Sequence, residues 1–285
     1  FTVNSKGAIR FGLSALKNMG EGSGDDIITE RKTNGPFKSI FDLTTRVSLK
    51  SVNKKALEAI DSYIPHEGIP SEALIKMAKF KTVLDRWIQD NEITGTAIQC
   101  WNSVQENLGI NVCTLMSMMS ENLIPSACET DITGLLSMYT LQLAGNAPAI
   151  LVDWNNNYAS KKDECVLFHC GNFAKSYVPN ACMGNAKILA TTMGTENTMG
   201  TIEGRVVGDK MTYARVSTDD VNGMIRAYTG EGKFVDDKLD TFGARAVVEI
   251  PDLQELMHFI CLNGFEHHVA IAKENLSDII VEAFE

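Results

Sequence analysis

Apolar residues recur at helical spacing near the start of the chain. Leu13, Leu16 and Met19 share one helical face, and a second helix is expected to begin near Ile27 and Ile28. The glycines between these two patterns are Gly20, Gly22 and Gly24. This arrangement is typical of a helix-hairpin-helix, in which glycines let backbone N–H groups approach a phosphate. Glycines that only form a turn explain the pattern equally well.

The apolar pattern changes twice farther along the chain. Residues 72–110 predict two helices, and residues 111–160 alternate short apolar runs with helical stretches, as in an α/β layer. From Glu164 onward, short β-rich segments such as KMTYARVST and ARAVVEI are separated by glycine turns. The fold class that we expect is α/β plus β-rich. It comprises a small helical N-terminal segment, an α/β layer and an antiparallel β-barrel-like C-terminal domain.

Proline, glycine and charge mark a boundary between the first two parts. The segment IPHEGIP, from Ile64 to Pro70, suits a linker or a turn, and basic residues gather between Arg31 and Lys55. The acidic surplus lies mostly in the remainder. The expected domains are a helix-hairpin-helix-like segment, a junction, an α/β domain and a β-rich domain, over residues 1–60, 61–78, 79–163 and 164–285.

Composition excludes several classes of function. The net charge of -10 argues against bulk affinity for DNA. Seven cysteines without CxxC pairs, together with no signal peptide and no long apolar run, predict a reducing, cytoplasmic setting and no membrane association. Cys165, His169 and Cys170 resemble part of a zinc site. We expect no zinc there, because no second cysteine cluster completes a tetrahedral site.

The first block resembles part of a replication enzyme. The segments IRFGL, NGPFKSIFD and VNKKALEA are similar to the bacterial DNA polymerase III alpha subunit after its catalytic core, over about residues 1–60. The catalytic aspartates and the palm of that family are absent from this stretch. The resemblance therefore implies DNA contact through residues 1–60 at most, without polymerase chemistry.

Two carboxylates and a histidine pair are the candidate ligands in the second block. Glu129 lies in IPSACETDITG, and Asp153 ends an apolar strand in APAILVDW, where α/β sheets often carry sites. Taken alone, such carboxylates more often lie at the surface or cap helices. His267 and His268 follow an apolar segment, and on a strand only one of them faces a given site. Two carboxylates with one imidazole suit Mn²⁺ or Mg²⁺.

The second block is similar to the second and C-terminal domains of the L-fucose isomerase family, over about residues 66–285. The segments that carry this resemblance are GTAIQCWNSVQ, IPSACETDITG, APAILVDW, VLFHCGN, DTFGARAVVEIPDL and GFEHHVAI. It implies that Glu129 and Asp153, which are 24 positions apart as in the family, bind the metal and move a proton through an enediol. It implies His267 as the third ligand, with His268 as the fallback and His169 as an extra contact. A buried strand histidine is the alternative for His169.

The resemblance also implies partners and leaves alternatives open. A sugar substrate and a homo-oligomer are expected, although the family's first domain, which helps to close its active site, has no counterpart here. Metal binding is expected to survive this difference better than turnover. Three interpretations follow: a metal-dependent aldose–ketose isomerase or an incomplete catalytic part of one, a DNA-binding module of a replicative polymerase, and a non-natural composite of two gene fragments. The sequence identifies neither the sugar nor which carboxylate is the base.

Overall fold

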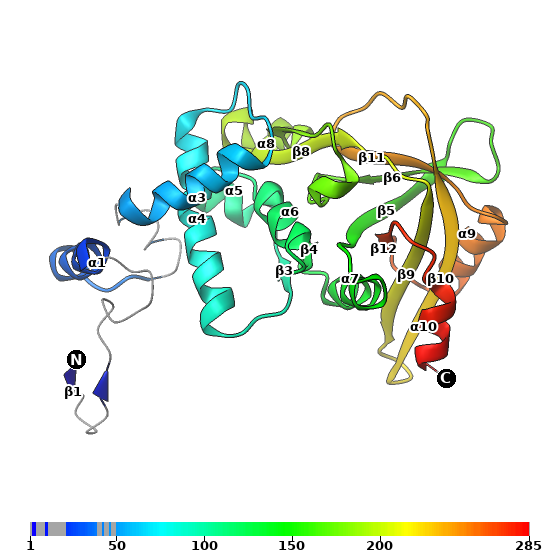
Figure 1. The fold of residues 1–285 in the computed structure, drawn as a ribbon, viewed down its shortest axis with the longest axis horizontal. Coiled ribbons are helices and arrows are strands. Elements are labelled where there is room, and N and C mark those ends of the chain that lie inside the picture. The colour runs from blue at the N-terminus through cyan, green and yellow to red at the C-terminus, as the bar shows by residue number, and fades with distance from the viewer. Residues whose placement is uncertain are drawn as a thin grey trace. The chain divides into compact units, whose positions relative to one another are not determined.

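A computed structural model describes residues 2–3, 9–10, 21–38, 42, 46 and 50–284 of the chain (Figure 1). The chain divides into two compact units. The first contains Phe1–Tyr63 and Pro70–Asn91, and the second contains Ile64–Ile69 and Glu92–Glu285.

Helices dominate the first unit. In chain order its described elements are β1 (Thr2–Val3), β2 (Ile9–Arg10), α1 (Glu21–Asn34), α3 (Lys50–Tyr63) and α4 (Ser71–Asp90). Helices α3 and α4 pack together and fully bury Ile60 and Met77. The small helical N-terminal segment expected from the sequence is therefore present.

The second helix begins earlier than the sequence pattern placed it. Helix α1 already begins at Glu21, so Gly22 and Gly24 lie inside this helix rather than in a turn before Ile27. A glycine inside a helix costs about 1 kcal/mol relative to alanine but does not prevent the helix. The expected first helix through Leu13 and Met19, with Gly20 after it, lies outside the described residues.

An eight-stranded sheet forms the centre of the second unit. Its spatial order is β10 (Met224–Val235), β9 (Lys210–Asp219), β12 (His268–Ala272), β5 (Ile150–Asn157), β6 (Glu164–His169), β11 (Ala244–Glu249), β8 (Met199–Arg205) and β7 (Cys182–Asn185). Neighbouring strands pair antiparallel, except that β11 and β8 run parallel. Strand β10 also pairs with β11, so six strands from β10 to β11 form a closed ring of pairings. The expected β-rich part is present as a mixed sheet, which also includes β5 from before Glu164.

A smaller α/β part precedes and flanks this sheet. Strands β3 (Thr96–Ile98) and β4 (Ser126–Cys128) pair in parallel. The helices of the unit are α5 (Ser103–Leu108), α6 (Cys113–Glu121), α7 (Ile132–Gly145), α8 (Lys187–Met193), α9 (Leu253–Leu262) and α10 (Ser277–Phe284), with short 3₁₀ turns at Lys175–Tyr177 and Thr195–Asn197. A mixed α/β fold is thus confirmed. None of the helices in the described part of the chain is both long and apolar enough to cross a membrane.

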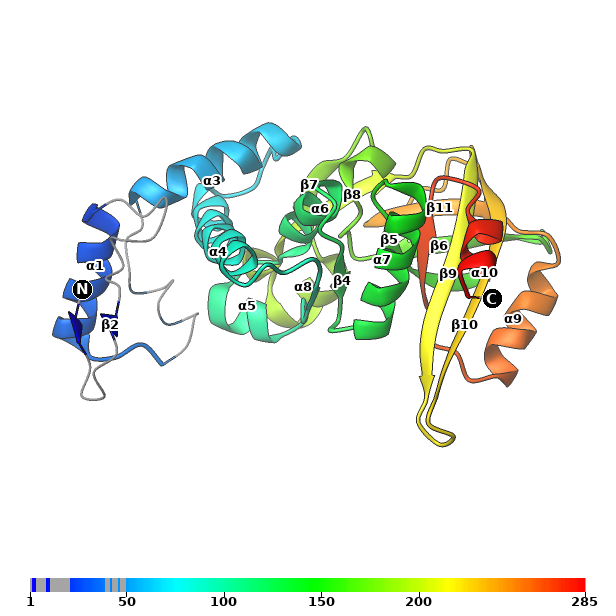
Figure 2. The same cartoon turned by 60° about the horizontal axis from the view of Figure 1, so that its bottom comes forward.

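The core lies between α7 and the large sheet. Helix α7 contacts β9 and β12, and it lies beside β9 in both ribbon views (Figures 1 and 2). Met138 and Leu141 of α7 are fully buried against small residues of the strands, among them Ala214 and Ala270. Because these alanines are small, the helix can approach the sheet closely. This packing fixes the start of α7 beside the start of β12, where the N-cap Asp131 meets His268.

Candidate functional site

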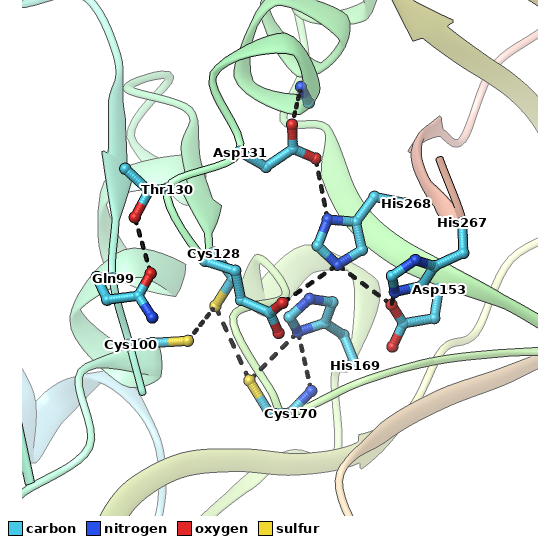
Figure 3. A network of polar contacts seen from close by, with 12 residues as sticks. Gln99, Cys100, Cys128, Thr130, Asp131, Asp153, His169, Cys170, His267 and His268 are labelled. Atoms are coloured by element: carbon cyan, nitrogen blue, oxygen red, sulfur yellow. Dashed lines mark hydrogen bonds and ion pairs between the residues drawn. The ribbon is translucent and has the colours of Figure 1, made fainter. Parts of the chain in front are cut away.

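The candidate ligands come together where several strands begin or end (Figure 3). Asp153 lies on β5 directly opposite His268, the first residue of β12, because the two residues are register partners. His169 is the last residue of β6, the other neighbour of β5. Glu129 follows the last residue of β4. Pairing of β5 with β12 and β6 therefore assembles residues that are up to 115 positions apart in the sequence, and Glu129 joins them from the end of β4.

His268 occupies the centre of this group. Its Nε2 atom lies 3.3 Å from Asp153 Oδ1 and 3.7 Å from Glu129 Oε2. This buried atom has no hydrogen-bond partner among the described residues, so it faces two carboxylate oxygens without being bonded to either. A nitrogen in that position suits a cation placed between the three side chains.

His267 also reaches the site, which differs from the expectation that only one imidazole of the pair would do so. Its Nε2 atom lies 3.2 Å from Asp153 Oδ1. The alternation of side chains applies within a strand, and β12 begins only at His268, so His267 precedes the regular pleat. The two imidazoles differ in burial, because the side chain of His267 is 69% exposed and that of His268 is 8% exposed.

Asp131 and Arg215 support the site and were not identified from the sequence. Asp131 Oδ2 lies 2.9 Å from His268 Nδ1, and the same carboxylate accepts hydrogen bonds from Arg215 at 2.5 and 3.1 Å. Asp131 is also the N-cap of α7, where it accepts from the N–H of Gly134. An aspartate before a helix is a recognisable cap signal. No local pattern points to Arg215, which comes from the middle of β9.

This arrangement determines which ring nitrogen keeps its proton when His268 is neutral, as it is when it binds a metal. An ionised carboxylate can only accept hydrogen bonds, so His268 Nδ1 donates to Asp131 and Nε2 is the atom left for a ligand. Histidines that bind metals commonly have such a carboxylate behind them, because it fixes the tautomer and the ring orientation. The geometry therefore suits a metal ligand.

The acidic and basic groups have shifted pKa values. Burial lowers the pKa of His268, but the carboxylates of Asp131 and Asp153 outweigh burial and raise that pKa to about 9. Burial raises the pKa of Glu129. For Asp153, burial acts in the same direction but His268 and the other imidazoles prevail, so its pKa is lowered. Of the two carboxylates, Glu129 therefore takes up a proton more readily.

His169 is buried and has the opposite tautomer. Its Nδ1 atom accepts a hydrogen bond of 2.9 Å from the backbone N–H of Cys170, so the ring proton of the neutral form lies on Nε2. Burial lowers the pKa of His169, which favours this neutral form. Its Nε2 atom has no hydrogen-bond partner within the described part of the chain.

The backbone at Glu129 is strained. Glu129 and Thr130 have φ angles of 60° and 59°, in the left-handed region that non-glycine residues seldom adopt. Each such residue costs on the order of 1–3 kcal/mol, and strain of this kind clusters at functional sites. A hydrogen bond of 2.8 Å from Thr130 Oγ1 to Gln99 helps to hold this conformation.

Two overlapping groups of side chains could hold a metal ion. One contains Glu129, His169 and His268, and the other contains Asp153, His267 and His268. In each group, one ligand atom per residue lies within 4.8 Å of the others. His268 belongs to both groups, and all of the residues expected from the sequence belong to at least one.

Comparison with known proteins confirms both resemblances. Residues 167–285 match the family model for the L-fucose isomerase C-terminal domain, and residues 1–62 match that for a helix-hairpin-helix motif. The chain is 29% identical over 222 residues to a sulfoquinovose isomerase from Priestia aryabhattai, covering 74% of this chain and 46% of that protein. A sulfoquinovose isomerase from Alkalicoccus urumqiensis is 26% identical over 212 residues, covering 73% and 46%. The chain thus spans about half the length of these curated relatives.

The first block matches a different protein. Over 60 residues the chain is 48% identical to a DNA polymerase III subunit alpha from Pseudomonas fluorescens, which covers 21% of this chain and 5% of that protein. The two blocks therefore resemble different proteins, a sugar isomerase in one case and a DNA polymerase subunit in the other. The sugar isomerase similarity covers the part that contains the candidate site.

Proposed function

We propose that the second unit is the metal-binding part of an aldose–ketose isomerase related to L-fucose isomerases. The similarity to sulfoquinovose isomerases supports a sugar isomerase. The observation that carries the proposal is the position of His268. Its Nδ1 atom is bonded to Asp131, and its Nε2 atom faces Asp153 and Glu129 at 3.3 and 3.7 Å.

In this proposal Glu129, Asp153 and His268 hold the ion. Two carboxylate oxygens with one imidazole nitrogen fit Mn²⁺ or Mg²⁺ better than a thiophilic metal. His267 is the ligand that the family resemblance implies, but its imidazole is largely exposed, and within the described part of the chain no carboxylate pairs with its Nδ1 atom. Its contact with Asp153 suits a role at the rim of the site.

His169 suits donation of its Nε2 proton to a substrate oxygen rather than metal binding, because its Nδ1 atom is already an acceptor.

The two carboxylates divide the chemistry. The bound ion would supply polarisation of the carbonyl and adjacent hydroxyl of an open-chain sugar. Glu129 would remove the proton from one carbon and return it to the neighbouring carbon, through an enediol. Its raised pKa suits this exchange, since a general base works best when its pKa approaches the working pH. Asp153, whose pKa is lowered, would remain ionised.

Metal binding provides the first test of the site. Mn²⁺ titration followed by electron paramagnetic resonance should show binding that weakens by at least about tenfold in His268→Gln, because even the loss of a residue behind a metal ligand typically costs about tenfold to a hundredfold. The matched control is His258→Gln, because His258 is exposed on α9. Equal affinities in the two variants would refute the ligand assignment.

Turnover is tested separately, because the chain spans about half the length of its relatives. L-fucose and sulfoquinovose are suitable substrates, with exchange of the transferred proton for solvent deuterium as the readout. Exchange that is lost in Glu129→Gln while Mn²⁺ binding persists would support Glu129 as the proton carrier. Exchange that persists in this variant would contradict it.

Four expectations from the sequence stay predictions. They are a homo-oligomer, a reducing cytoplasmic setting, a barrel-like C-terminal domain and the division at residues 60, 78 and 163.

A second function is favoured for the first unit. The helix-hairpin-helix match over residues 1–62 supports DNA binding by that segment. We expect affinity for duplex DNA that falls as salt is raised, since the contacts are to phosphates. Deletion of residues 1–62 should abolish it, and unchanged binding after the deletion would contradict the assignment.

The composite interpretation concerns the junction between the two blocks. The tryptic peptide ALEAIDSYIPHEGIPSEALIK, residues 56–76, crosses that junction. Its detection in a tryptic digest of the purified protein would establish that both blocks belong to one polypeptide. Peptides from both blocks without it would show two molecules.

A further inference from the structure

Four cysteines that are far apart in the sequence form one cluster in the second unit. They are Cys100, Cys113, Cys128 and Cys170, and their sulfur atoms all lie within 4.8 Å of one another. Cys100 follows β3, Cys113 begins α6, Cys128 ends β4 and Cys170 follows β6. Figure 3 shows three of these side chains pointing toward one another. The expectation that no second group of cysteines would accompany Cys170 is therefore wrong.

The distances match the size of a tetrahedral thiolate site. The sulfur atoms of Cys128 and Cys100 are 3.2 Å apart, those of Cys113 and Cys170 are 3.5 Å apart, and those of Cys128 and Cys170 are 3.8 Å apart. Zinc–sulfur bonds are about 2.3 Å long, so four tetrahedral ligands lie about 3.8 Å from one another. In an iron–sulfur cluster the four thiolates are spread over two or four iron atoms, so they cannot all lie this close to one another. The spacing favours a single ion.

Burial makes this group unusual for free thiols. All seven cysteines of the chain are free, and Cys100, Cys113 and Cys128 have no exposed surface. A thiol is a weak hydrogen-bond donor and acceptor, so four of them facing one another satisfy each other poorly. A bound cation would replace these weak contacts with four strong bonds.

Buried polar side chains hold the backbone next to two of the cysteines. The carbonyl of Cys100 accepts a hydrogen bond of 2.9 Å from Gln105, whose side chain is buried. The N–H of Cys113 donates at 2.9 Å to the side chain of Asn111, which is fully buried. The backbone positions of these two cysteines are thus held before any ion binds, as a high-affinity site requires.

We propose that Cys100, Cys113, Cys128 and Cys170 bind one Zn²⁺ ion as thiolates, at a structural site separate from the candidate isomerase site. On binding, each thiol forms a sulfur–zinc bond and releases its proton to solvent, and no redox partner is needed. Four protein ligands close the tetrahedron and leave no position for substrate, which is typical of structural zinc. The ion would link β3, α6, β4 and β6.

The location gives this ion a specific consequence. Cys128 directly precedes Glu129, and Cys170 directly follows His169. The zinc would therefore tie together the two chain segments that carry these site residues, including the strained backbone at Glu129. This consequence rests on the proposed function, whereas zinc binding itself does not.

Metal analysis of the purified 285-residue chain tests the site directly. After gel filtration we expect about one zinc ion per chain by mass spectrometry, as a closed four-cysteine site retains its metal. Cys113→Ser should lose it. Cys182→Ser should keep it, because Cys182 is exposed and outside the cluster. His268→Gln should also keep its zinc, which distinguishes this site from the carboxylate and histidine site.

If Cys113→Ser fails to fold, replacing zinc by Co²⁺ in the unaltered chain tests the four-thiolate site. Four thiolates around Co²⁺ should give strong sulfur-to-cobalt charge-transfer absorption and the visible bands of tetrahedral cobalt. Absence of these bands would overturn the proposal. So would disulfides between Cys100 and Cys128 and between Cys113 and Cys170, found by peptide mapping of protein purified without reductant. Zinc that persists unchanged in a folded Cys113→Ser variant would overturn it as well.

Discussion

The carboxylate of Asp131 offers a quantitative test of how the candidate site is supported. It accepts hydrogen bonds from Arg215, from the N–H of Gly134 and from His268 Nδ1. Asp131→Asn keeps the shape of the side chain and an oxygen that can cap α7, but it removes the negative charge. Arg215, whose side chain is 1% exposed, then keeps one charged partner among the described residues. This partner is the carboxylate of Glu266, whose side chain is 42% exposed.

The expected loss follows from these contacts. Removing one partner of a buried ion pair typically costs about 3–5 kcal/mol, because the other charge remains buried. The helix cap is worth about 0.5–2 kcal/mol and is retained by asparagine. Arg215 also keeps a hydrogen bond of 2.8 Å to Thr133 Oγ1 and its ion pair with Glu266. We therefore expect the lower end of the range, a loss of about 3 kcal/mol in the free energy of unfolding.

Urea unfolding followed by tryptophan fluorescence measures this loss, because Trp154 is buried in β5 of the same unit. The matched control is Glu266→Gln, which removes the other ion pair of Arg215. Since Glu266 is partly exposed, this change should cost less than about 1 kcal/mol. Equal losses in the two variants, or a loss below about 1 kcal/mol in Asp131→Asn, would refute the inference that Asp131 neutralises a buried charge.

Two further pairs of variants test the packing around the site. Gly171 has a φ of 108°, and a Cβ atom there would collide with the backbone of Ile202, so Gly171→Ala should lower the free energy of unfolding by at least about 2 kcal/mol. Gly223→Ala, at a φ of 66° with open space around it, should cost only about 1 kcal/mol; similar melting temperatures for the two would contradict this reasoning. Leu141 of α7 is fully buried, so Leu141→Ala should cost about 3 kcal/mol in urea unfolding. Leu143→Ala, on a side chain that is 65% exposed, should change stability by less than about 0.5 kcal/mol, and a comparable loss would show that the two leucines are packed alike.

The sequence by itself determined the kinds of residue available and the two families that the chain resembles. The motifs around Glu129, Asp153 and the histidine pair pointed to the isomerase resemblance, and the family comparison confirms that resemblance. Short β-rich segments separated by glycine turns after Glu164 also predicted the β-rich part, because strand propensity and turn residues are local properties of the chain. The glycines near residue 22 were misleading, since a glycine permits a turn without requiring one.

Tertiary structure alone decided which of these residues meet. Register between β12 and β5 places His268 opposite Asp153, and the pairing of β12 with β9 brings Arg215 near Asp131. The four clustered cysteines have no common spacing in the sequence and meet only because β3, α6, β4 and β6 converge. Local periodicity tells which face of an element is buried, but it carries no information about which distant element covers that face. Strand register and helix packing supply that information, and they arise from contacts across the whole unit.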